Sequence, residues 1–337
     1  MKRARTPTVS APHPPGDMLP LFPAEPPAFR VELSAKLQRA AAQGVLFGTS
    51  SWKYEGWVGQ VYTAERYLTR GKFSQRRFEE SCLAEYAEVF PIVCGDFSFY
   101  QFPSPPFWQK LFGSAPEKLR FAFKVPEEIT VPVWPRHPRY GERAGTLNRS
   151  FLDAGVFKEL FLHLLEPYRE RVEVLIFEFG ALPRSIYERE EDFVMDLDRF
   201  LGELPRDVRW RYAVEIRNPE FLGPLYLAAL QDRGVAHVLN AWTRMPELLQ
   251  QLAIPGIFTA DFTVVRALLR QGRAYEEAVE AFQPYAKVQD PNPEAREALK
   301  QLAARTAARG EKGYYFVNNR LEGNAPSTID AVLSDDD

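Results

Sequence analysis

The sequence predicts an α/β protein of the (β/α)8 class, in which eight parallel strands close into a barrel inside a ring of helices. Short runs rich in β-branched and aromatic residues alternate with longer runs whose apolar residues recur at helical spacing. Eight such strand–helix units fit between residues 45 and 330, and eight is the number that closes a parallel barrel. An open, doubly wound sheet is the alternative. It is weakened because neither G-x-G-x-x-G nor G-x-x-x-x-G-K-[ST] follows any predicted strand.

Each predicted strand is a short apolar run that ends in polar or turn-forming residues. The strands are 45–52, 92–100, 120–126, 172–180, 211–221, 236–242, a less clear one within 256–268, and 312–319. Amphipathic spacing predicts the helices. They lie near 78–89, 157–165, 193–201, 225–230, 245–252 and 294–308, with a last one after Pro326. Gly234 is expected to cap the helix that precedes it.

Both ends of the chain are predicted to lie outside the barrel. Residues 1–28 are rich in proline and show no hydrophobic periodicity, so we expect a disordered tail. Residues 29–333 are expected to form one barrel domain. The short acidic end, residues 334–337, is expected to fray.

Composition narrows the possible functions. The net charge of −3 argues against a nucleic-acid-binding surface, which usually carries a basic excess. No apolar run approaches the roughly 20 residues that cross a bilayer, and no signal-peptide pattern opens the chain, so no membrane partner is expected. The two cysteines, Cys82 and Cys94, suit free thiols in a reducing cytoplasm. We therefore expect a cytoplasmic protein.

The alternation of side chains predicts a polar cavity at the carboxyl ends of the strands. On the fifth strand, Glu215 and Arg217 face inward with Ala213, and an isolated buried charge must be paired or directed at a ligand. The same reasoning turns Lys124 and Glu178 inward. The remaining expected ligand-binding residues are Asp96, Ser98, Tyr100, Trp52, Tyr54, Asn240, Trp242, Arg266, Asn318 and Asn319. This pattern predicts a site for a small polar molecule, possibly an anion.

Three of these residues are the catalytic candidates. Lys124 is interpreted as an anion-binding cation, a partner in a structural salt bridge or a covalent nucleophile. Glu178 and Glu215 come from adjacent strands, so they would act either as a general acid and base or as members of a charge network. Cys94 lacks an adjacent histidine and is expected to be a packed thiol.

Metal and cofactor sites are not expected. The four histidines, which are His13, His137, His163 and His237, do not converge on a zinc site. Magnesium held by Asp96, Glu178 and Glu215 is an alternative that the sequence leaves open.

Two further features each have two interpretations. The run EGNAP (322–326) precedes the last helix, where free N–H groups together with Arg266 would bind a phosphate or where the run would only cap the helix. Trp52, Tyr54, Trp57 and Trp242 would form an aromatic wall for a sugar or a base, or would pack in the core.

Several sequence blocks resemble those of a known family. The blocks GTSSWKYEGWVGQVY, FSFYQFPSP, RFAFKVPEEIT, AVEIRNPEF and YYFVNNRLEGNAP are similar, in the same order, to those of the YecE-like family, the domain of unknown function 72. The resemblance implies a barrel of the triosephosphate isomerase type and no established activity. It also implies departures: Cys94 stands where the family has Glu, Asp96 where it has Asn, and Glu178 where it has Gln. Leu268 stands where a His is often seen.

The sequence supports three hypotheses about function. The first is a metal-independent acid–base enzyme, such as a hydrolase, lyase or isomerase, in which Glu178 and Glu215 act on a sugar phosphate or organic acid held by Lys124 and Arg217. The second is a barrel that binds the same ligand without catalysis, which the departures from the family pattern favour. The third, a nuclease-like barrel, is disfavoured by the acidic charge balance and the lack of a histidine cluster.

Overall fold

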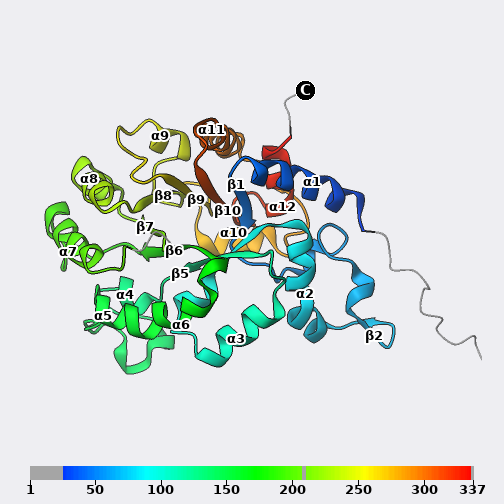
Figure 1. The fold of residues 1–337 in the computed structure, drawn as a ribbon, viewed down its shortest axis with the longest axis horizontal. Helices are drawn as coiled ribbons and strands as arrows, with labels where there is room; N and C mark the ends of the chain where they lie inside the picture. The colour runs from blue at the N-terminus through cyan, green and yellow to red at the C-terminus, as the bar shows by residue number, and fades with distance from the viewer. Residues whose placement is uncertain (1–25, 207–209, 335–337) are drawn as a thin grey trace, which may run out of the picture.

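Eight parallel strands form a closed barrel, as the sequence predicted. The computed structural model describes residues 26–206 and 210–334, and the strands follow one another around the barrel in the order β1-β10-β9-β8-β7-β6-β5-β4 (Figure 1). Their bounds are Val45–Thr49 (β1), Ile92–Gly95 (β4), Arg120–Lys124 (β5), Val172–Phe179 (β6), Tyr212–Ile216 (β7), Ala236–Ala241 (β8), Phe262–Ala267 (β9) and Lys312–Val317 (β10). They end between one and five residues before their predicted ends.

Helical segments connect successive strands on the outside of the barrel. The α-helices after the first strand are α2 (Gln75–Val89), α3 (Pro105–Ser114), α4 (Glu127–Thr130), α5 (Ala154–Phe157), α6 (His163–Leu165), α7 (Glu190–Gly202), α8 (Pro224–Arg233), α9 (Leu248–Leu252), α10 (Tyr275–Phe282), α11 (Pro293–Arg309) and α12 (Ala325–Val332). A π-helical segment, Lys158–Leu162, joins α5 to α6. Short 3-10 helices span Glu55–Trp57, Ala64–Tyr67, Asp96–Phe99, Pro138–Arg143, Glu166–Arg171 and Pro219–Phe221, and a small hairpin pairs β2 (Leu68–Thr69) with β3 (Lys72–Phe73).

Two predictions about helix ends can be compared with the structure. Gly234 follows α8 in the left-handed conformation, with φ 62°, as predicted for a glycine cap. The last helix does not begin after Pro326, because α12 begins at Ala325 with the proline inside its first turn. Proline is favoured there, since the first N–H groups of a helix have no intrahelical acceptor.

A helix precedes the first strand, where the sequence analysis placed none. This helix, α1 (Ala28–Ala42), buries Leu33 and Leu37, an apolar stripe too narrow to be recognised by periodicity. Its buried Arg30 forms an ion pair with Glu85 of α2. The predicted tail therefore ends before Ala28, and its residues 1–25, like the acidic end 335–337, lie outside the described residues.

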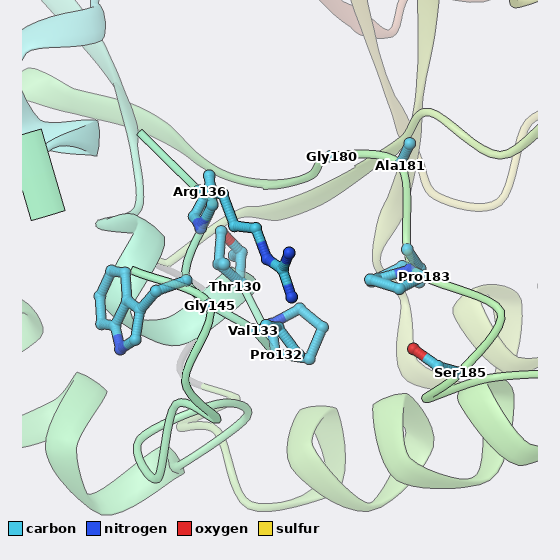
Figure 2. A pocket seen from close by; sticks show the side chains of 13 residues that line it. Thr130, Pro132, Val133, Arg136, Gly145, Gly180, Ala181, Pro183 and Ser185 are labelled. Atoms are coloured by element: carbon cyan, nitrogen blue, oxygen red, sulfur yellow. The ribbon is translucent and has the colours of Figure 1, made fainter. Parts of the chain in front are cut away.

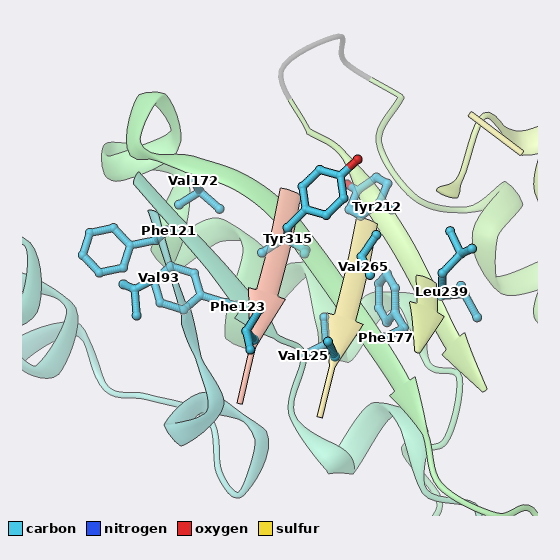
Figure 3. Packing of buried hydrophobic residues seen from close by; sticks show 14 of the residues in the cluster. Val93, Phe121, Phe123, Val125, Val172, Phe177, Tyr212, Leu239, Val265 and Tyr315 are labelled. Carbon is cyan, nitrogen blue, oxygen red and sulfur yellow. The ribbon is translucent and has the colours of Figure 1, made fainter. Parts of the chain in front are cut away.

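The two faces of the barrel wall have separate cores. Inside the barrel a compact cluster consists of Leu46, Ile92, Cys94, Ala122, Val174, Ile176, Ala213, Ala236, Val238, Phe262, Val264, Tyr314 and Phe316. Outside it, large side chains such as Phe121, Phe177 and Tyr315 pack under the helices (Figure 3). The inward and outward assignments made from the alternation of residues are thus confirmed for β5, β6 and β7. Burial raises the pKa of the Cys94 thiol, so Cys94 is a protonated core residue.

Candidate functional site

Six charged side chains fill the upper end of the barrel, above its apolar interior. We call Asp96, Lys124, Glu178, Glu215, Arg217 and Arg266 the charged cluster; they come from the carboxyl ends of β5, β6, β7 and β9 and from the residues that follow β4 and β7. Three carboxylates face three cations, so the cluster is balanced in charge. The strand register sets Glu178 directly beside Glu215, as expected for adjacent strands.

Arg266 is the centre of this cluster. Its side chain is 2% exposed, and its Nη1 atom donates to both Glu178 Oε2 and Glu215 Oε2. Its Nη2 atom lies 3.2 Å from Asp96 Oδ1. Arg266 therefore does not reach the start of α12, and the predicted phosphate site formed with the EGNAP run is not assembled. A buried guanidinium among three carboxylates is held in place because each charge compensates the desolvation of the others.

Glu178 is the carboxylate that joins all three cations. Its Oε2 atom lies 2.9 Å from Lys124 Nζ and 3.3 Å from Arg217 Nη2, in addition to the contact with Arg266. Burial opposes ionisation, but the charges of Lys124, Arg217 and Arg266 outweigh it and hold the pKa of Glu178 well below its ordinary range. Glu178 is thus ionised at neutral pH, so it can accept a proton as a weak base and cannot act as a general acid.

Among the described residues, Arg266 Nε is a buried donor without a partner, and Arg217 has two such donors. Its Nη2 atom pairs with Glu215 and Glu178, whereas its Nε and Nη1 atoms have no hydrogen-bond partner among the described residues. The side chain is 5% exposed, and its guanidinium lies over the Trp242 ring, 3.9 Å from the centroid. A buried donor without an acceptor costs about 1–3 kcal/mol, so these atoms are suited to receive an oxygen from a ligand.

Two predicted site residues on the second strand are placed differently. The strand ends at Gly95, where a Cβ atom would lie 2.8 Å from the Phe97 and Phe123 rings, and the chain then turns into a 3-10 helix. Ser98 is buried, and its hydroxyl donates to the backbone carbonyl of Lys124 at 2.6 Å. Tyr100 is 57% exposed, beneath the guanidinium of Arg139. Neither side chain joins the cluster.

The predicted asparagines have structural partners. Asn240 is fully buried, and its amide nitrogen donates to the backbone carbonyls of Ile216 and Val238, each at 3.3 Å. Asn318 Oδ1 accepts from the backbone N–H of Arg320 at 3.0 Å, within the turn after β10. Asn240 Oδ1 nevertheless has no hydrogen-bond partner among the residues described.

The start of α12 is capped by the chain itself. Asn319 Oδ1 accepts from the Ala325 N–H at 2.8 Å, and Asn324 Oδ1 accepts from the Ser327 N–H at 2.8 Å. Because these side chains occupy donors that an anion would use, the capping interpretation of the EGNAP run is the one that the geometry supports.

The four predicted wall aromatics do not form one wall. Trp57 is fully buried, donates to Asn319 Oδ1 and packs against Tyr54, with ring centroids 4.8 Å apart. Trp242 lies beneath Arg217. Trp52 packs edge-on against Phe97, with ring centroids 6.1 Å apart, on another side of the barrel end.

Two cavities open among the segments that follow the strands β1, β4, β5 and β6. One, of about 570 Å³, lies between the segments 130–136 and 180–185, and Figure 2 shows Arg136 reaching into it. The other, of about 440 Å³, lies beside β1 and β4 and is lined by Asp96. Neither of these two cavities is lined by Lys124, Glu215 or Arg217.

Phe99 and Glu127 are two members of the surroundings that sequence reasoning missed. The Lys124 ammonium lies over the Phe99 ring, 3.7 Å from its centroid. Glu127 is buried, accepts from the Tyr140 hydroxyl at 2.7 Å and pairs with Arg139, which ties the long loop before α5 to the end of β5. The alternation within FSFY gave no signal for Phe99, because the chain is no longer a strand there.

The donor groups of the cluster do not resemble a metal centre. Within residues 26–206 and 210–334, no group of three or more His, Cys, Asp or Glu side chains is arranged to hold a metal ion. The magnesium alternative fails on geometry, since the Arg266 guanidinium sits among Asp96, Glu178 and Glu215. Over the same residues, no helix is both long and apolar enough to cross a membrane.

The fold and the cluster together define a parallel (β/α)8 barrel with a charge-balanced site at the carboxyl ends of its strands. Comparison with known proteins identifies the family. The chain belongs to the family described as protein of unknown function DUF72, whose model matches residues 46–335, and the resemblance to the YecE-like family is thereby confirmed.

Two solved structures are similar to this chain. A DUF72 family protein from Thermotoga maritima is 21% identical with a TM-score of 0.54, over 86% of this chain and 96% of that one. A DUF72 family protein from Enterococcus faecalis is 18% identical with a TM-score of 0.54, over 87% of this chain and 97% of that one. At such identities the likeness shows the fold alone. No match was found among proteins of curated function.

Proposed function

We propose that the barrel binds a small hydroxylated molecule with an anionic group, such as a sugar phosphate or hydroxy acid, over the charged cluster. The observation that carries this proposal is Arg217, a buried cation whose Nε and Nη1 atoms have no acceptor in the described part of the chain. An anionic oxygen would supply the missing acceptor, and charge-assisted hydrogen bonds to guanidinium groups are among the stronger ones in proteins.

The carboxylates support the hydroxylated part of this ligand class. Side chains of Glu178 and Asp96 are 14% and 31% exposed, so they are accessible at the top of the cluster, whereas Glu215 is fully buried behind them. An ionised carboxylate only accepts hydrogen bonds, and hydroxyl groups are suitable donors. Because the cluster is balanced in charge, the ligand is selected by local pairing and not by a strong overall field.

A second candidate function, metal-independent acid–base catalysis, is favoured by the state of Glu178. An ionised, partly exposed carboxylate beside a cationic anchor can remove a proton from a bound substrate. The geometry does not favour the predicted acid–base pair, because Glu215 is enclosed by Arg217 and Arg266. Under this proposal Glu178 is the single base, and Lys124 and Arg217 hold the charge of the substrate.

Thermal shift and calorimetric titration of the full chain with sugar phosphates and hydroxy acids test the binding proposal. Arg217→Lys keeps the positive charge beside Glu215 but removes the planar set of donors. We expect a ligand of the wild type to bind this variant at least about tenfold more weakly, in line with the loss of a charge-assisted hydrogen bond. Arg233→Lys, at an ion pair between α8 and α7, is the matched control and should bind normally.

Two results separate the alternatives. The binding proposal fails if no compound of either class stabilises the wild type. If a compound binds Arg217→Lys as well as it binds the wild type, its binding site is elsewhere. A ligand that binds is then incubated with wild type and Glu178→Gln and followed by NMR spectroscopy. Conversion by the wild type alone supports the enzyme, and an unchanged ligand with both proteins supports the binding barrel.

A further inference from the structure

The cavity of about 440 Å³ beside β1 and β4 has the features of a second ligand site. Its volume falls within the roughly 300–1,000 Å³ typical of small-molecule pockets. Three aromatic side chains line it: Trp52, Phe97 and Phe107. The Phe97 ring lies 6.1 Å from Trp52 and 5.0 Å from Phe107, centroid to centroid, so the three rings form one apolar wall. Phe107 is 39% exposed, which leaves an aromatic surface uncovered at the opening.

Two buried polar groups of this wall lack hydrogen-bond partners. Trp52 Nε1 and Ser50 Oγ are buried atoms without a partner among the described residues, and both residues line the cavity. Ser50 is 1% exposed and Trp52 is 7% exposed. Both atoms can donate a hydrogen bond, and an indole N–H can only donate. A ring that carries nitrogen or carbonyl acceptors satisfies such donors, whereas a plain hydrocarbon ring does not.

The charged residues that line the cavity indicate which substituent the aromatic ring of the ligand has. Lys53 and Lys110 line the cavity, and neither ammonium group has an ion-pair partner within the described part of the chain. Two carboxylates of α2 also line the cavity: Glu80 is paired with Arg76, and Glu79 accepts a hydrogen bond from the Gln75 side chain. The Lys53 ammonium lies over the Trp52 ring, 5.8 Å from its centroid, and a lysine without an ion pair is suited to an anionic substituent such as a phosphate. The cavity also includes Asp96, a carboxylate that accepts hydrogen bonds from hydroxyl groups.

We propose that this cavity binds a nucleoside monophosphate. The base stacks against the wall of Trp52, Phe97 and Phe107, the phosphate pairs with Lys53 and Lys110, and ribose hydroxyls face the carboxylates. The site is separate from the ligand position over Arg217, although Asp96 borders both. It accounts for four features that the charged cluster does not use: the aromatic wall, its exposed edge, the donors without a partner among the described residues, and the two lysines that form no ion pair there.

Calorimetric titration of the full chain with the four ribonucleoside 5′-monophosphates tests this proposal. At least one of them is expected to bind with a stoichiometry of one, at least about tenfold more tightly than its nucleoside or ribose 5-phosphate. Phe107→Ala should weaken that binding by about tenfold through lost stacking. Phe73→Ala, an exposed phenylalanine of β3 outside the cavity, is the matched control and should bind as the wild type does.

The lysines give a second, independent measurement. Lys53→Met and Lys110→Met should weaken binding of the nucleotide and leave binding of its nucleoside unchanged, and Lys118→Met, on the loop before β5, should change neither. The proposal is overturned if none of the four nucleotides binds more tightly than ribose 5-phosphate, or if Phe107→Ala equals Phe73→Ala. It is also overturned if Arg217→Lys abolishes nucleotide binding while Phe107→Ala retains it, because the nucleotide then occupies the charged cluster.

Discussion

The guanidinium of Arg266 on β9 forms an ion pair with the carboxylate of Glu215 on β7, across the intervening strand β8. The two side chains are 2% and 0% exposed. The interior of the barrel towards the amino ends of the strands contains apolar side chains. The Arg266–Glu215 contact lies where charged side chains replace them.

Removal of the central cation should destabilise the protein strongly. Arg266→Met leaves Asp96, Glu178 and Glu215 without their shared partner, and a broken buried pair costs about 3–5 kcal/mol. Urea denaturation measures this loss of unfolding free energy. The double variant Arg266→Met/Glu215→Met removes both buried charges and should recover part of it.

The ion pair of Arg233 on the protein surface is the control for the effect of Arg266→Met on the unfolding free energy. Arg233 pairs with Asp198 at the helix surface, with side chains 27% and 39% exposed, and Arg233→Met should cost less than about 1 kcal/mol. Equal losses for Arg266→Met and Arg233→Met would show that the cluster is not a buried network.

Gly48 should not tolerate a side chain. A Cβ atom there would lie 2.1 Å from the backbone oxygen of Ile92, at the pairing of β1 with β4 that closes the barrel. Since backbone atoms cannot rotate away, Gly48→Ala should lower the unfolding free energy by more than about 3 kcal/mol or prevent folding. Gly113→Ala is the control. It lies in α3 with no atom within 4 Å of its Cβ position, and it should be neutral or slightly stabilising. Similar stability of the two variants would contradict the observed closure.

His237 should make stability depend on pH between mildly acidic and neutral conditions. The side chain is buried on β8, with Nδ1 3.1 Å from the Tyr226 hydroxyl, and burial lowers its pKa to about 3. The unfolded chain takes up a proton at His237 below about pH 6.5, while the folded protein does not. The unfolded state therefore binds more protons, and stability should fall by about 1.4 kcal/mol per pH unit below that value. His237→Gln should flatten this slope in urea denaturation series, and an unchanged slope would show that the imidazole is protonated in the fold.

Glu178 should contribute a second pH dependence at lower pH. Its pKa is depressed in the folded protein by Lys124, Arg217 and Arg266, in spite of burial. Its ionised form therefore stabilises the fold above the unfolded pKa of about 4.3, and this contribution is lost as the pH falls through the lower folded pKa. The stability difference between wild type and Glu178→Gln should be largest near neutral pH and shrink below about pH 4. A difference that stays constant over this range would contradict the proposed ion pairing.

The strands could be predicted from the sequence because the alternation of inward and outward side chains is a local property. Val174 and Ile176 point into the barrel and Leu175 and Phe177 point to the helices, as the period of two residues requires. The strand ends were less accurate. The strand β4 ends at Gly95, where a Cβ atom would contact the Phe97 and Phe123 rings, and that crowding exists only after packing. Helix α1 was missed because its burial depends on contacts with α2 and α12, which lie far away in the sequence.

The members of the charged cluster could be predicted from the sequence, but their arrangement could not. Lys124, Glu178, Glu215 and Arg217 meet as the alternation predicted, since each lies at the carboxyl end of a neighbouring strand or just beyond it. The central role of Arg266 was not foreseen, because which carboxylates a long side chain reaches depends on distances across the barrel.

The sequence by itself determined the barrel, the family and the level at which polar residues replace apolar ones, because period-two alternation and sequence blocks are local properties. Only the tertiary structure decided which charges pair, which donors of Arg217 remain unused and where cavities open. Those features depend on side chains from distant strands meeting in a space that no single segment defines.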